Sequence, residues 1–132
     1  MKKLILLSFC CLFGLAISAQ TSAKAVVAEF EANVELTKAQ KKQVSAIEKA
    51  FENDWKEIAP LKNSDPKQYY NKLAYMKEVK VGKVRELLTE DQMVDYRAFR
   101  QAKSKERTAQ YEKMQSEGMP SNEIRIKLLE SM

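Results

Sequence analysis

The pentapeptide LTKAQ at residues 36–40 recurs as LTEDQ at residues 88–92, 52 positions further along the chain. Both copies contain leucine, threonine and, three residues after the threonine, glutamine. This spacing is typical of a helix start, because the threonine hydroxyl accepts from the third N–H of the helix and the glutamine side chain accepts from the threonine N–H. The leucine can pack on the first helical turn. The two pentapeptides therefore predict two helices that begin in the same way.

The residues that follow the first pentapeptide predict a long helix over residues 38–59. Their apolar positions are three or four residues apart, which places them on one face over about six turns. Pro60 ends this helix, and residues 61–65 are expected to form a loop. Trp55 is expected to lie buried at a helix pairing or a dimer interface. The apolar stripe consists of Val44, Ile47, Phe51, Trp55 and Ile58.

A second helix is predicted to begin at Asp65 and Pro66, because aspartate is a favoured N-cap and proline is tolerated at the first helical position. A third runs from Thr89 to Gly118, and shorter helices are expected at residues 23–34 and 120–132. No segment has the alternation of a strand, so the chain is predicted to be all-α. The expected inner faces carry Tyr69, Leu73, Met76, Val84 and Leu87 in the second helix, Met93, Tyr96, Phe99 and Ala102 in the third, and Ile124, Leu128 and Leu129 in the last.

Composition excludes several classes of function. The chain has 132 residues, which is too short for a dinucleotide-fold or barrel enzyme, and it contains no histidine. Histidine-dependent triads and dyads and histidine-ligated zinc or iron sites are therefore ruled out. The formal net charge of +5 is mildly basic and by itself identifies no partner. We expect no enzyme activity and no cofactor.

Residues 1–19 have the features of a signal peptide. Two lysines precede an apolar run over residues 4–17, and Ala19 ends a small-residue cleavage site. The run is shorter than the roughly 20 residues of a membrane span, and no later segment is apolar enough, so no stable membrane insertion is expected. Residues 20–132 are expected to form a single helical domain.

Both cysteines lie within the predicted signal peptide, so the exported chain is expected to have no disulfide. A lipid anchor is an alternative to simple secretion. However, Phe9 precedes Cys10 and Cys10 precedes Cys11, where a lipoprotein signal has a small residue, so secretion is favoured.

Apolar residues suited to a core are scarce. Ile, Leu, Val and Phe make up 22 of residues 20–132, which indicates a folded but thin protein. A thin helical layer generally buries its inner face against a second copy of itself, which favours a homodimer.

With its paired Leu-Thr-x-x-Gln motifs, the chain resembles the Spy/CpxP family of periplasmic proteins. The resemblance implies about four helices in a thin, bent helical hairpin that forms an antiparallel, cradle-shaped homodimer. It also implies a periplasmic, ATP-independent chaperone that binds unfolded envelope proteins. The motif residues are then part of the scaffold: Leu36, Thr37, Gln40, Leu88, Thr89 and Gln92.

Candidate contacts for a client or partner lie on the third predicted helix. A basic stripe of Arg97, Arg100, Lys103 and Arg107 follows helical spacing, with Ser104 among them. It is either an ordinary solvated face or a positive surface for acidic clients. Because the chain is expected to be exported, no nucleic-acid partner is expected for this stripe. Met114 is a flexible apolar side chain of the kind that promiscuous surfaces use.

An acidic cluster surrounds the second motif: Glu86, Glu90, Asp91 and Asp95. Acids in the first turn complement the helix dipole, which explains Glu90 and Asp91 without a metal. No glycine-turned ligand loop of the calcium type accompanies the cluster, so no metal site is predicted.

Two alternatives to the chaperone hypothesis stay open. Some members of the family restrain the periplasmic domain of an envelope-stress sensor kinase, and the basic helix face would suit such a partner too. A structural envelope protein without clients is the third interpretation.

Overall fold

Helices account for most of the chain that the computed structural model describes, residues 23–131. They are α1 (Ala23–Asn33), α2 (Lys38–Ile58), α3 (Leu61–Ser64), α4 (Pro66–Leu87), α5 (Glu90–Ser116) and α6 (Ser121–Glu130). No strand occurs in this range. The predicted all-α fold class is confirmed, with six helices where about four were expected. The predicted signal peptide lies outside the described residues.

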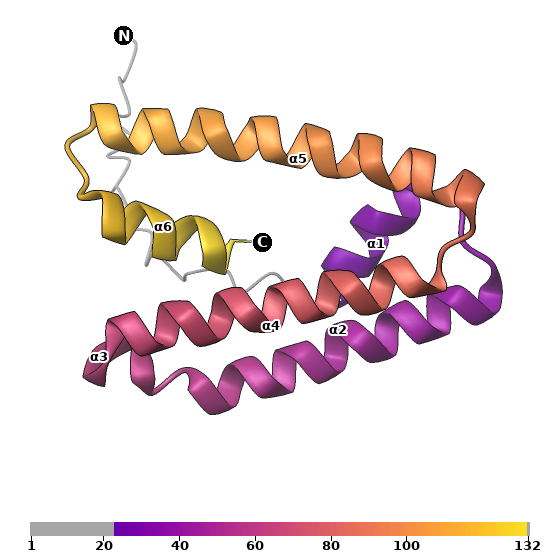
Figure 1. Ribbon diagram of the computed structural model, residues 1–132, viewed down its shortest axis with the longest axis horizontal. Coiled ribbons are helices and arrows are strands. Elements are labelled where there is room, and N and C mark those ends of the chain that lie inside the picture. Colours follow the sequence, from indigo (N-terminus) through magenta and orange to yellow (C-terminus); the bar gives the residue numbers. More distant parts are fainter. Residues whose placement is uncertain (1–22, 132) are drawn as a thin grey trace, which may run out of the picture.

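The segment predicted to be a loop between α2 and α4 contains the single-turn helix α3. Its N-cap is Pro60, with φ −59° and ψ −27°, and the carbonyl of Leu61 accepts from the N–H of Asp65 at 2.8 Å. Pro60 has no N–H to donate, so it ends α2. Its fixed φ is nevertheless compatible with a new helical turn, which explains why a short helix forms where a loop was predicted. The turn reverses the chain, so that α4 runs back along α2 (Figure 1).

The ends of the long helices follow local chemistry. The Asp65 carboxylate accepts from the N–H of Gln68 at 3.0 Å, which caps α4 as predicted. At the end of α5, Gly118 has a φ of +85°, a conformation that glycine adopts without steric cost. The chain reverses there, and α6 folds back beneath α5 (Figure 1).

Two separate apolar clusters hold the helices together. The first, at the end where both motifs lie, joins α1, α2, α4 and α5. The second, at the opposite end of α2 and α4, takes partly buried residues from α6. The buried members are Phe30, Val34, Leu36, Val44, Val84 and Tyr96 in the first cluster, and Phe51, Trp55, Ile58, Tyr69 and Leu73 in the second. The inner faces predicted for α2 and α4 are thus confirmed.

Trp55 lies buried where α2 and α4 pair, one of the two places predicted for it. Its indole N–H donates to the Tyr69 hydroxyl at 2.8 Å, and that hydroxyl donates to Glu130 of α6 at 2.8 Å. The second cluster is therefore linked to α6 by a chain of hydrogen bonds as well as by apolar contact.

Helix α5 stands apart from the α2–α4 pair over much of its length (Figure 1). It packs on α1 near its start and on α6 near its end. Ala102, expected on the inner face, is exposed. After Phe99 the inner face of α5 continues in steps of three or four through partly buried residues, which are Lys103, Arg107, Tyr111 and Met114.

Candidate binding cavity

The two motifs meet through their glutamines. Gln40 Nε2 donates to Gln92 Oε1 at 2.8 Å, and Gln92 Nε2 donates to Gln40 Oε1 at 2.8 Å. Each oxygen also accepts from the N–H of its own threonine, at 2.9 Å for Thr37 and 3.0 Å for Thr89. Both capping boxes are complete, since each threonine hydroxyl accepts from the N–H of its glutamine. We call this arrangement the glutamine pair.

Each glutamine also binds the backbone that leads into the other motif. Gln40 Nε2 donates to the carbonyl of Leu87, and Gln92 Nε2 donates to the carbonyl of Glu35, each at 2.7 Å. The two carbonyls are related by the same 52-residue offset as the motifs. The contact is therefore symmetric, and it fixes the starts of α2 and α5 beside each other. The repeat in the sequence was a signal for the pairing of the two glutamines. Sequence reasoning used it only to predict two helix starts.

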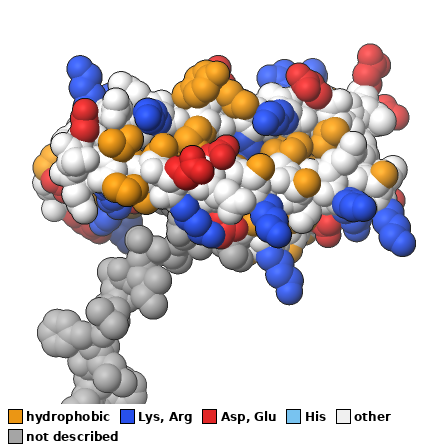
Figure 2. All heavy atoms as spheres, turned by 90° about the horizontal axis from the view of Figure 1, so that it is seen from below, with side chains coloured by type: hydrophobic (Ala, Val, Ile, Leu, Met, Phe, Trp, Pro, Cys, Tyr) orange, Lys and Arg blue, Asp and Glu red, His pale blue; other side chains and the backbone are white. Residues whose placement is uncertain are grey.

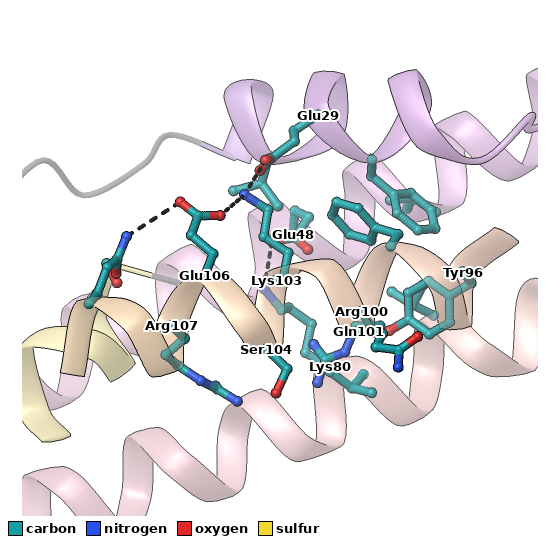
Figure 3. A pocket seen from close by; sticks show the side chains of 18 residues that line it. Glu29, Glu48, Lys80, Tyr96, Arg100, Gln101, Lys103, Ser104, Glu106 and Arg107 are labelled. Carbon is teal, nitrogen blue, oxygen red and sulfur yellow. Dashed lines mark hydrogen bonds and ion pairs between the residues drawn. The ribbon is translucent and has the colours of Figure 1, made fainter. Parts of the chain in front are cut away.

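A cavity of about 550 Å³ opens beneath α5, with walls from α1, α2, α4 and α5. Apolar side chains of the first cluster form one part of its lining, and charged side chains form the rest (Figure 3). The apolar lining residues include Val26, Phe30, Val44, Val84 and Phe99. Its size lies within the roughly 300–1,000 Å³ that is usual for small-molecule sites.

A buried ion pair lies in the wall opposite α5. Lys80 Nζ and a Glu48 carboxylate oxygen are 3.1 Å apart, and the two side chains are 10% and 8% exposed. Lys80 Nζ also lies 4.4 Å from the centroid of the Phe51 ring, a cation–π contact. The pair fixes the Lys80 ammonium group at the cavity wall, with the Glu48 carboxylate as its counter-charge.

Lys77, one turn before Lys80, is more deeply enclosed. Its Nζ lies 5.6 Å from the Phe51 ring centroid and 5.4 Å from that of Trp55, and it has no hydrogen-bond partner within residues 23–131. Burial, followed by the neighbouring charge of Lys80, lowers the pKa of Lys77 to about 7, although Glu48 opposes the shift. A neutral amine is a nucleophile, but this one is shielded from solvent, so the geometry gives a substrate no access to it.

Helix α5 supplies the opposite wall. Arg100, Ser104 and Arg107 project from it into the cavity toward the side where Lys80 lies (Figure 3). Lys103 lies at the other rim, where it pairs with Glu29 of α1 and, at 3.4 Å, with Glu106. The hydrogen bond to Glu29 is the main cause that raises the pKa of Lys103.

The structure brings three of the five candidate contact residues together at this cavity: Arg100, Lys103 and Arg107. Arg97 is exposed and Met114 is partly buried, and neither belongs to the cavity lining.

Sequence reasoning missed Glu48, Lys77 and Lys80. The signal was present, because the inner stripe of α4 runs through Lys77 and Lys80 between Leu73 and Val84 at helical spacing. Counting only apolar residues removed these lysines from the stripe.

Apolar side chains also reach the outer surface. Tyr75 of α4 is 69% exposed, and Val79, one turn later, is 36% exposed. Val94 of α5 is 64% exposed. The face seen from below carries hydrophobic side chains in a broken row among lysines and arginines (Figure 2).

Comparison with known proteins identifies no relative of this chain. No family model matches it. No curated protein and no solved structure matches it either. Within residues 23–131, no helix has the length and apolar character to cross a membrane. In the same range, no three acidic, cysteine or histidine side chains gather to hold a metal ion.

Proposed function

We propose that this chain is a periplasmic, ATP-independent chaperone of the Spy/CpxP type, which binds unfolded envelope proteins as a homodimer and keeps them from aggregating. The observation that carries the proposal is the pair of Leu-Thr-x-x-Gln capping boxes joined by Gln40 and Gln92. This motif pair is what the chain has in common with that family. The joined helix starts support a scaffold role for the motifs.

The surface composition supports binding of unfolded chains. Tyr75, Val79 and Val94 expose apolar area, and the face in Figure 2 carries hydrophobic side chains among lysines and arginines. Unfolded chains present apolar segments together with acidic ones. The small, divided apolar clusters leave long helix faces uncovered, which supports pairing with a second copy. Such mixed surfaces suit many partners better than one.

The test is an aggregation assay on the processed chain, Gln20 to Met132, with a chemically unfolded client and no nucleotide. The expected result is suppression at near-stoichiometric ratios, with light scattering giving the mass of a dimer. Arg97→Gln should weaken suppression of an acidic client. Lys56→Gln, which removes an exposed positive charge from α2, is the matched control and should leave it unchanged. Failure to protect any of several clients would contradict the proposal.

A folded dimer that protects no client would instead favour the regulatory partner of a sensor kinase. In that case deletion of the gene raises stress signalling in unstressed cells. A folded monomer without activity would argue against the family resemblance itself.

A further inference from the structure

The cavity beneath α5 combines two linings that a single ligand can satisfy together. One part is apolar and belongs to the first cluster, with Val44, Val84 and Phe99 at its surface. The other part is lined by Lys80 of α4 and by Arg100, Ser104 and Arg107 of α5. These donors face the cavity from two different helices (Figure 3). A ligand with an apolar body and an anionic head group matches both parts.

The charges around the cavity are unevenly distributed. At one rim Lys103 is neutralised by Glu29 and Glu106. On the opposite side Glu48 is the acid that faces Lys80, while Arg100 makes no ion pair with residues 23–131. Arginine carries five N–H donors in a fork that fits a carboxylate or phosphate, and a serine hydroxyl adds another donor. Because Glu48 balances Lys80, Arg100 supplies the surplus positive charge on this side, which favours an anion and disfavours a metal cation.

The aromatic lining is less suited to a nucleotide base. Phe30 lies edge-on to Tyr96 with ring centroids 5.6 Å apart, and its centroid is 6.0 Å from that of Phe99. The rings are engaged with one another, whereas a base requires an aromatic face to stack on. Flexible acyl chains need only apolar area, which the valines and ring edges provide.

We propose that this cavity binds a single-chain anionic amphiphile, with its carboxylate between Arg100 and Lys80 and its acyl chain against Val44, Val84 and Phe99. This goes beyond the proposed chaperone function and does not depend on it.

The test is titration calorimetry of the processed chain with dodecanoate below its micelle concentration, and with dodecanol as the uncharged probe. Dodecanoate is expected to bind one site per chain about tenfold more tightly than dodecanol, because only the anion gains charge-assisted hydrogen bonds. Equal affinities for the two probes, or no binding of dodecanoate, would overturn the proposal. This comparison uses the processed chain without a substitution, so it does not depend on the folding of a variant.

Two variants locate the site. Arg100→Gln should weaken dodecanoate binding about tenfold and leave dodecanol unchanged, since it removes the partner of the head group alone. Ser104→Phe should weaken the binding of both probes, because the phenyl ring would fill part of the cavity. Lys105→Gln, on the same helix but outside the lining, is the matched control. If Lys105→Gln lost as much dodecanoate affinity as Arg100→Gln, binding would respond to general surface charge, and this result would overturn the proposal.

Parallel aggregation assays keep the two proposals distinct. A chain that binds dodecanoate but protects no client overturns the chaperone function alone. A chain that protects clients but binds neither probe overturns the amphiphile site alone.

Discussion

Raising the pH from 7 to 9 should stabilise the folded chain, because of Lys77. Burial lowers the pKa of this amine from 10.5 to about 7 in the folded state. Between these two values the unfolded chain keeps a proton that the folded chain has released. The free energy of unfolding therefore rises with pH across this interval. The charged groups that act on the amine come from four helices: Lys80 of α4, Glu48 of α2, Arg107 of α5 and Glu130 of α6.

The size of the effect follows from the two pKa values. A difference of one pKa unit corresponds to about 1.4 kcal/mol. Because the folded amine is already half deprotonated at pH 7, the gain between pH 7 and pH 9 is about 2 kcal/mol. Burial raises the pKa of Tyr69 to about 12 and also raises that of Tyr96, which lowers stability above pH 10. The interval from pH 7 to 9 avoids these tyrosines.

Urea unfolding at pH 7, 8 and 9, followed by far-ultraviolet circular dichroism, measures the change. A gain of about 2 kcal/mol moves the midpoint up by about 1 to 2 M urea. In Lys77→Met the dependence on pH should disappear, and this variant should be at least as stable as the wild type at pH 7, since an apolar side chain replaces an unpaired buried charge. Lys83→Met, at an exposed position of α4, should keep the wild-type dependence. A wild-type urea midpoint that stays constant between pH 7 and 9 refutes this reasoning. So does a midpoint of Lys77→Met that depends on pH as strongly as that of the wild type.

Three further changes test the scaffold by urea unfolding at pH 7. Gln40→Leu should cost about 2 to 4 kcal/mol, because it removes several hydrogen bonds and leaves the amide of Gln92 with unpaired groups; a cost below 1 kcal/mol would argue against the glutamine pair. Glu48→Leu should cost about 3 to 5 kcal/mol because Lys80 stays buried without its partner, and the double variant with Lys80→Met should recover most of this loss. Gly118→Ala should cost about 1 to 2 kcal/mol because of its positive φ, and an unchanged midpoint would contradict the turn geometry.

The features that sequence alone predicted are those decided by neighbouring residues. Helix starts at Thr37, Asp65 and Thr89 depend on a side chain and an N–H three residues away, so they can be inferred locally. The inner faces of α2 and α4 follow from strict apolar spacing. Both kinds of inference required no knowledge of how the helices pack.

The cavity depended on information that local patterns lack. The basic residues of α5 were recognised as a group, but whether Arg100 and Arg107 face solvent or the interior is decided by α1 and α6, which hold α5 away from α4. Lys77 and Lys80 occupy core positions because Phe51 and Glu48 lie opposite them, and these contacts join residues about thirty positions apart. Hydrophobic periodicity cannot anticipate a charged residue that is buried with its partner.

The glutamine pair has a consequence for how this chain can change over generations. Each amide supplies both a donor and an acceptor to the other, so replacing one glutamine leaves the other with unmet hydrogen bonds at the junction of two helix starts. A substitution at position 40 therefore carries a penalty, and a matching substitution at position 92 can relieve the part that arises between the two amides. Substitutions at positions 40 and 92 should therefore be coupled, so that a change at one is accompanied by a change at the other.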